Sequence, residues 1–132
     1  MIHNIKYFLL IFIFSANFAC AQKDSNAQFE NISAEEVKEK LEKKEDIVLL
    51  DVRTEQEFNS SMGHIENAIL IPVQNLAERV SELEKYKEKE IIVYCRSGNR
   101  SMAGTKILVE NGFNAKNMLG GMISWNQLKK KD

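Results

Sequence analysis

The sequence has little of what marks several specialised classes of protein. Its 132 residues include only two cysteines, one proline and six glycines. That is too little cysteine for a disulfide scaffold or a structural zinc site, and the glycine and proline contents exclude a collagen-like chain. An excess of either charge is also absent, since 18 basic residues face 19 acidic ones. A chain this balanced has no electrostatic basis for binding nucleic acid, and its length fits a single domain.

The longest apolar run lies at the N-terminus. Lys6 is the only Lys, Arg, Asp or Glu before Lys23, and residues 7–14 are all apolar or aromatic. A positive start, a short apolar centre and small residues at the end predict a secretory signal peptide over residues 1–21. The run is shorter than the roughly 20 apolar residues of a membrane-spanning helix. We therefore expect export to the bacterial cell envelope, as a periplasmic protein or a membrane-anchored lipoprotein.

Two cleavage sites fit this segment. A small-x-small pattern ending at Ala21 suits ordinary signal peptidase. Residues 18–20 resemble a lipoprotein box, with cleavage before Cys20 and acylation of its thiol, although Asn17 stands where that box usually has an aliphatic residue. In both cases the mature chain keeps one unmodified thiol, Cys95, which has no partner for an internal disulfide.

Short apolar strands alternate with amphipathic helices over residues 31–132, which we assign to one domain after a flexible polar linker at 22–30. Three of the predicted strands are continuous apolar runs, as in buried parallel sheets, and the first helix follows a capping box. This alternation predicts an α/β domain with a mostly parallel central sheet flanked by helices. The predicted strands are 47–50, 68–71, 91–94 and 116–119, and the predicted helices are 34–43, 75–86, 101–111 and 124–130.

The residues that could take part in catalysis or binding lie in one loop, 95–101, between a strand and a helix. Ligands of parallel sheets bind at the carboxyl ends of the strands, and a helix that starts near Arg100 directs its free N–H groups toward the loop. These donors, together with Arg96 and Arg100, favour a thiolate at Cys95, which predicts a lowered pKa and a nucleophilic sulfur. Gly98 lets the backbone curl into a cradle of amides. The alternative, an inert core cysteine, fits poorly with the polar and cationic residues that follow it.

This loop, Cys95-Arg96-Ser97-Gly98-Asn99-Arg100-Ser101, resembles the active-site loop of single-domain rhodaneses, the thiosulfate:cyanide sulfurtransferases. Two more segments are similar to the first and last signatures of that family. They are Leu50-Asp51-Val52-Arg53 with Glu57-Phe58 and Gly63–Ala68, and Leu119-Gly120-Gly121-Met122 with Trp125. The three motifs occur in the family's order and span nearly the whole mature chain.

The resemblance implies a sulfurtransferase that needs no metal or organic cofactor. Cys95 would attack the outer sulfur of thiosulfate or a similar donor, expel sulfite and become a persulfide. Cyanide, a small thiol or a thioredoxin-like protein would then accept the sulfur. The loop amides would hold the charge of the persulfide, and the two arginines would orient the anionic donor. The substrate-binding residues implied in this way are Arg96, Ser97, Gly98, Asn99 and Arg100.

Two other functions stay open at this point. Phosphatases and arsenate reductases of a similar plan place one more residue between cysteine and arginine than the four, 96–99, of this chain. The shorter loop suits one sulfur atom better than a phosphoryl group. The second alternative is a non-enzymatic persulfide carrier or interaction module in the envelope. The intact cysteine and the loop arginines favour the enzyme over this alternative.

The remaining motif residues are expected to have structural roles. Asp51 and Arg53 would tie loops together as an ion pair, because paired charges near a sheet edge commonly act as scaffolding. His64 is predicted to have a structural role in a turn or in packing and not to act as a base for Cys95, since a thiol of low pKa needs no base. Residues 120–121 would permit close backbone approach beside the loop, and Trp125 is predicted to lie in the core.

Overall fold

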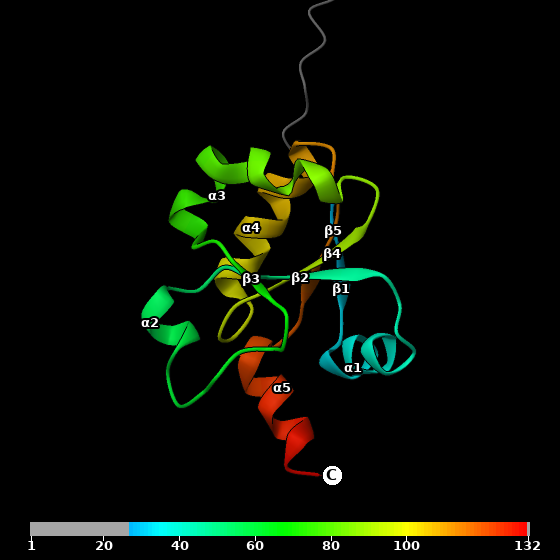
Figure 1. Cartoon of the computed structure of the whole chain (residues 1–132), viewed down its shortest axis with the longest axis vertical. Coiled ribbons are helices and arrows are strands. Elements are labelled where there is room, and N and C mark those ends of the chain that lie inside the picture. The colour runs from blue at the N-terminus through cyan, green and yellow to red at the C-terminus, as the bar shows by residue number, and fades with distance from the viewer. Residues whose placement is uncertain (1–26, 132) are drawn as a thin grey trace, which may run out of the picture.

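The computed structural model describes residues 27–131, which form a five-stranded sheet with helices on both faces (Figure 1). The strand order is β1-β5-β4-β2-β3 and every neighbouring pair is parallel, which confirms the predicted α/β fold. The strands are β1 (Glu30–Ile32), β2 (Ile47–Asp51), β3 (Ile69–Leu70), β4 (Glu90–Tyr94) and β5 (Asn114–Met118). The helices are α1 (Ala34–Glu42), α2 (Glu55–Phe58), α3 (Val73–Arg79), the 3-10 helix η1 (Val80–Tyr86), α4 (Asn99–Glu110) and α5 (Gly121–Lys129).

The sheet separates two apolar cores. Side chains alternate between the faces of a strand, so Ile91 and Val93 of β4 pack on the side of α3 and α4, whereas Ile92 packs on the side of α1 and α5. Both sets are buried. This is why β4 reads as a continuous apolar run rather than an alternating one.

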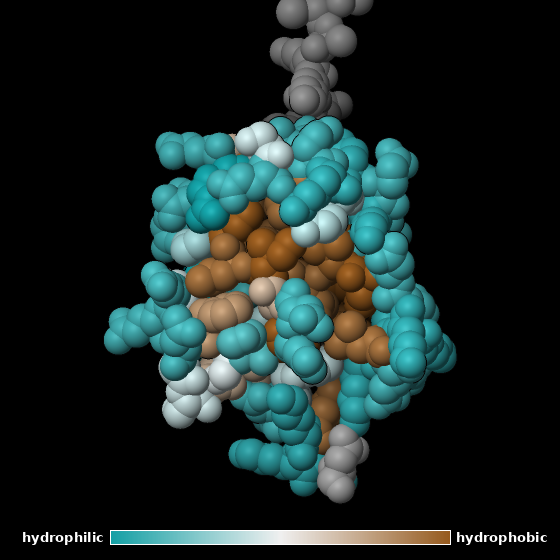
Figure 2. Space-filling model, in the orientation of Figure 1, coloured by the Kyte–Doolittle hydropathy of each residue, from teal (hydrophilic) through white to brown (hydrophobic). Residues whose placement is uncertain are grey.

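A shallow hollow lined by both apolar and polar side chains lies beside β2 and β3. Figure 2 shows apolar side chains gathered over the middle of the molecule, where Figure 1 places β2 and β3, with polar ones around them. A hollow of about 290 Å³ at this end of the sheet includes Leu41, Ile47, Ile69 and Tyr86 in its lining. It does not include the Cys95 loop.

Several elements differ from the prediction. Strand β1 was not predicted, because only Ile32 of its three residues is buried and no apolar run marks it. Helix α2 was also missed, since four residues show no helical period, although Thr54 and Glu57 form a capping box. The helix predicted over 75–86 is an α-helix that continues as a 3-10 helix. Helix α5 begins three residues before Ser124, directly after Gly120 in the left-handed conformation.

Part of the sequence-based prediction lies outside the described residues. This part comprises the signal peptide over 1–21, the cleavage alternatives at Cys20 and Ala21, and residues 22–26 of the predicted linker. Within residues 27–131, no helix has the length and apolar character needed to cross a bilayer.

The parallel arrangement brings the three sequence motifs together. Asp51 at the end of β2 pairs in register with Tyr94 at the end of β4, and Val93 pairs with Asn117 of β5. The segments that follow these strands therefore leave the sheet at one edge, which we call the carboxyl edge. Cys95 lies there, directly after β4.

Candidate active site at the carboxyl edge of the sheet

The sulfur of Cys95 is buried within a polar loop. The residue is 1% exposed, and its inner side packs against the apolar core under α4. The sulfur itself accepts a hydrogen bond from the N–H of Gly98 at 3.1 Å and lies 3.4 Å from the hydroxyl oxygen of Ser101. Cys95 is thus a core residue on one side and a loop residue on the other, and its sulfur belongs to the loop.

The surroundings of the thiol favour its ionised form. Burial by itself raises the pKa of Cys95, but hydrogen bonding between the sulfur and the Ser101 side chain, together with hydrogen bonds from loop amides, outweighs it and brings the pKa below its ordinary value. The amides are those of Ser101, Gly98 and Ser97. The predicted lowering of the pKa is confirmed in direction, whereas its leading causes are hydrogen bonds and not the two arginines.

Helix α5 holds the loop from behind. The N–H groups of Met122 and Ile123, in the first turn of α5, donate to the carbonyl oxygens of Cys95 at 2.9 Å and Arg96 at 3.1 Å. First-turn amides have no partner inside their own helix, so they are free for this task. In a planar trans peptide the N–H points away from the C=O. Binding these two carbonyls to α5 therefore turns the next amides, including that of Ser97, toward the sulfur.

The close approach of α5 depends on Gly121. A Cβ atom at this position would overlap the carbonyl oxygen of Cys95 and lie 2.7 Å from the carbonyl carbon of Arg96. Its φ of +52° is also in the region that residues with a side chain avoid. The close backbone approach predicted for residues 120–121 is therefore confirmed.

Arg100 is bound by a residue that the sequence analysis did not connect with it. Its two terminal nitrogens donate to the carboxylate oxygens of Glu57 in α2, at 2.7 and 2.6 Å. Hydrogen bonds from Arg100, opposed by burial and helped by Thr54, lower the pKa of Glu57 to about 2. Because α2 was not predicted, this pair was not either. Arg100 lies beside the loop as expected, and its role in donor binding stays a prediction.

The other loop residues predicted to bind substrate face outward or form the cradle. Arg96, Ser97 and Asn99 are exposed, while Gly98 is buried with a φ of +111°. Within the described part of the chain Arg96 has no ion-pair partner. It lines a hollow of about 260 Å³ together with Arg53, Glu57 and residues 60–62. Its charge is thus directly available to an anion that enters beside the loop.

Arg53 connects the end of β2 to the segment that follows α2. Its guanidinium is fully buried, with one terminal nitrogen 2.6 Å from the carboxylate of Asp51 and 2.8 Å from the carbonyl oxygen of Gly63. The predicted structural role of the Asp51–Arg53 pair is confirmed. Two further structural predictions are confirmed as well. The ring of His64 stacks on that of Phe58 with their centroids 3.6 Å apart, and Trp125 lies in the core.

Residues 33–128 of the chain match the family model of the Rhodanese-like domain. The chain belongs to the rhodanese-like domain family. It is 39% identical over 98 residues to YtwF of Bacillus subtilis, covering 74% of this chain and 91% of that protein. A protein of Allochromatium vinosum named sulfurtransferase is 34% identical over 95 residues, covering 71% of this chain and 85% of that one.

The fold of this rhodanese-like domain also matches a solved structure. The rhodanese-like domain protein of Staphylococcus aureus superposes with a TM-score of 0.66 at 33% identity, covering 74% of this chain and 91% of that one. The resemblance found in the sequence is therefore confirmed at the level of the family. Membership and the sulfurtransferase among its relatives support a sulfurtransferase-type role.

Sequence reasoning missed two polar residues of the rhodanese-like domain that lie behind the sulfur. Asn117 of β5 has its Oδ1 2.6 Å from the hydroxyl oxygen of Ser101, and its Nδ2 donates to Oδ1 of Asn31 in β1 at 2.9 Å. Asn117 is buried. A polar side chain in a buried strand next to the glycine pair was the available signal, but its partner could not be read from the sequence.

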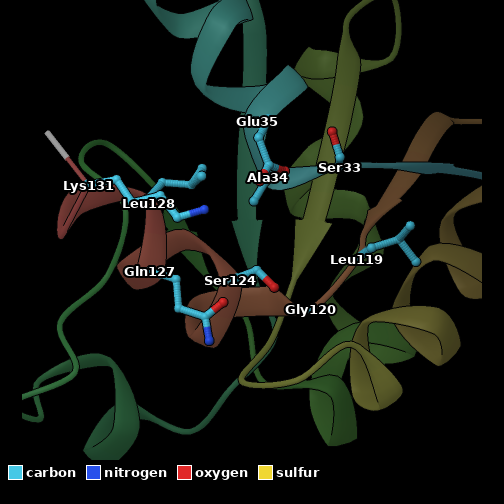
Figure 3. Close-up of a pocket in the computed structure, with 9 residues that line it drawn as sticks. All are labelled: Ser33, Ala34, Glu35, Leu119, Gly120, Ser124, Gln127, Leu128 and Lys131. Carbon is cyan, nitrogen blue, oxygen red and sulfur yellow. The ribbon is translucent and has the colours of Figure 1, made fainter.

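A separate hollow lies between the start of α1 and helix α5. It measures about 180 Å³ and is bounded by residues 33–35 and by Leu119, Ser124, Gln127 and Lys131 (Figure 3). It contains neither Cys95 nor the loop arginines. In the described residues, no group of three or more His, Cys, Asp or Glu side chains is placed to hold a metal ion.

Proposed function

We propose that this rhodanese-like domain transfers a sulfane sulfur from thiosulfate or a similar anionic donor to cyanide or a thiol, through a persulfide on Cys95. The observation that carries the proposal is the position of the Cys95 sulfur, which is surrounded by inward-turned amides that lower its pKa. A single sulfur anion is the species that such a small cradle stabilises.

The reaction has two displacement steps. In the first, the thiolate of Cys95 attacks the outer sulfur of thiosulfate, a new S–S bond forms, and the S–S bond of thiosulfate breaks with its electron pair leaving on sulfite. In the second, the acceptor attacks the terminal sulfur of the persulfide, and the electron pair of the breaking bond returns to Cys95 as thiolate. No external oxidant, reductant or proton is needed when the acceptor is an anion. This sequence gives ping-pong kinetics.

Donor recognition is assigned mainly to Arg96. Its guanidinium is exposed beside the loop, whereas the charge of Arg100 is balanced by Glu57 at 2.6 Å. A free guanidinium matches the paired oxygens of a sulfonate-type anion. We therefore expect Arg96→Ala to raise the KM for thiosulfate more than it lowers kcat.

The surface around the loop suits a protein acceptor such as a thioredoxin-like dithiol. The exposed large apolar side chains among the described residues are Met102, Leu119 and Ile123. The N–H of Met102 donates to Gly98 of the loop and that of Ile123 to Arg96, while Leu119 precedes the glycine pair. Apolar side chains left exposed around a reactive group are a surface that a partner can cover.

The test is a transfer assay on the purified protein with thiosulfate and cyanide. We expect thiocyanate release and, before cyanide is added, a mass increase of one sulfur atom; both are lost in Cys95→Ser and retained in Cys20→Ser. Formation of the adduct without turnover would instead favour the persulfide carrier, and absence of both would favour the interaction module. Hydrolysis of an aryl phosphate that depends on Cys95 would favour the phosphatase alternative.

We also propose that the protein is exported and anchored by a lipid on Cys20. Strand β1 starts at the edge of the parallel sheet opposite Cys95, so a tether before β1 would leave the active loop facing away from the membrane. Labelling with radioactive fatty acid, which Cys20→Ala should abolish, tests the anchor. Release of a mature chain that starts at Gln22 would instead show ordinary signal-peptide cleavage.

A further inference from the structure

Three polar side chains form a chain of contacts that ends at the sulfur of Cys95. Asn117 Nδ2 donates to Asn31 Oδ1 at 2.9 Å, and Asn117 Oδ1 lies 2.6 Å from Ser101 Oγ. Ser101 Oγ in turn lies 3.4 Å from the sulfur. Ser101 and Asn117 are 0% and 1% exposed, whereas Asn31 is exposed. The chain therefore runs from the surface at β1, across β5, to the reactive atom.

The Ser101 hydroxyl has more acceptors around it than protons. Besides Asn117 Oδ1, the carbonyl oxygen of Gly98 lies 2.9 Å from Ser101 Oγ. A hydroxyl has one proton, and giving it to either oxygen leaves only lone pairs for the sulfur. Cys95 must then donate its own S–H. In this arrangement the hydrogen bonds satisfy a neutral thiol, whereas a thiolate can only accept hydrogen bonds and requires the hydroxyl proton to point at the sulfur.

Rotation of one carboxamide removes this conflict. A half-turn of the Asn117 amide would present its N–H to Ser101 Oγ and its oxygen to Asn31. The Asn31 amide is exposed and can turn to donate in return. Ser101 Oγ would then accept from Asn117, and its proton would be free for an anionic sulfur. Every group that is bonded in the first arrangement has a partner in the second.

We propose that the Asn31–Asn117–Ser101 chain reverses its hydrogen-bond direction with the charge on the Cys95 sulfur, which makes Asn117 a positioning residue for the thiolate and the persulfide. The inference deepens the proposed sulfur transfer and rests on it for the persulfide. Its test uses thiol reactivity alone, so the two can fail separately. The charged groups around the loop are Arg96, the Arg100–Glu57 pair and the Asp51–Arg53 pair, and all of them are kept in the variants below.

The first variant is Asn117→Asp, which is nearly isosteric but offers two acceptor oxygens and no donor. Ser101 must then donate to Asp at position 117, and the sulfur loses its hydroxyl donor. We expect alkylation of Cys95 by iodoacetamide at pH 7 to slow about tenfold and its pH midpoint to rise by about one unit. The reaction is followed by mass spectrometry of the tryptic peptide 90–96, which separates Cys95 from Cys20. The matched control is Asn114→Asp, which adds the same charge at an exposed site of β5 and should leave the alkylation rate unchanged.

A second variant avoids a buried carboxylate. Asn31→Asp makes the exposed end of the chain an acceptor only, which holds Asn117 Nδ2 toward β1 and should shift the alkylation midpoint in the same direction by a smaller amount. In a Ser101→Ala background both shifts should shrink to that of the Asn114→Asp control. Unchanged midpoints in both Asp variants, or an undiminished shift without the Ser101 hydroxyl, would overturn the inference. If Asn117→Asp does not fold, Asn31→Asp decides alone.

Discussion

At the carboxyl edge of the sheet, polar side chains bond to backbone groups as well as to one another, whereas the Lys40–Glu90–Lys116 network at the opposite, amino edge joins charged side chains to one another. Arg53 shows the first arrangement, with Asp51 on one side and the carbonyl oxygen of Gly63 on the other. Glu90 shows the second. It lies between Lys40 and Lys116, each at 3.2 Å.

The difference lies in how strictly the partners are held. The amino-edge network ends in Glu45 and Glu30, whose side chains are 41% and 75% exposed and can exchange their contacts with water. Exposed pairs of this kind contribute little to stability, while removing one member of a buried pair leaves an uncompensated charge. Four predictions test this contrast, beginning with the largest effect.

Arg53→Met should cost the most stability. The substitution leaves the fully buried carboxylate of Asp51 without its cation, and breaking a buried pair in this way costs about 3–5 kcal/mol. Urea denaturation of the purified protein measures the loss. Arg53→Met combined with Asp51→Leu should recover part of it, and a cost below about 1 kcal/mol for the single variant would remove the contrast between the two edges.

Gly121→Ala should cause the second largest loss of stability, about 2–4 kcal/mol. The reason is that the new methyl group overlaps the backbone of the Cys95 loop at a position with a positive φ. The matched control is Gly63→Ala, which has a φ of +67° but no atom within 4 Å of the added carbon. The control should cost about 1 kcal/mol. Denaturation midpoints give both values, and equal losses in the two variants would show that φ alone matters at Gly121.

Glu57→Gln should have a smaller effect that depends on pH. The folded pKa of Glu57, about 2, lies below its ordinary 4.5, so the pair with Arg100 stabilises the protein above pH 4.5 and loses this contribution as the pH falls toward 2. We expect the free energy of unfolding at pH 7 to be about 1–2 kcal/mol larger for the wild type than for Glu57→Gln, allowing for solvent screening of a partly exposed pair. Denaturation curves between pH 7 and pH 2 should converge at the acid end. A difference that stays constant with pH would contradict the assignment.

Lys116→Met should have the smallest effect. Its ammonium is 3.0 Å from Glu30 and 3.2 Å from Glu90, but the network is partly exposed and Lys40 remains next to Glu90. We expect a loss of about 0.5–1 kcal/mol and an unchanged rate of Cys95 alkylation. A loss as large as that of Arg53→Met would show that the amino edge is held as strictly as the carboxyl edge.

The sequence was most informative where one segment decides its own structure. The buried run of β4, the capping box at Ser33 and the loop after Cys95 were recognised because the relevant residues are neighbours in the chain. Elements with short or polar sequences, such as α2 and β1, gave no periodic signal. Their absence from the prediction also hid the partner of Arg100.

The amino-acid sequence by itself determined the parallel α/β class, the family, and the placement of one cysteine in a glycine-containing loop before a helix. Only the tertiary structure decided the partners of these groups: Glu57 for Arg100 across 43 residues, and Asn31 for Asn117 across 86. The physical reason is that helix caps and buried strands depend on neighbouring residues. Hydrogen bonds across the carboxyl edge depend instead on which strand ends the crossovers bring together.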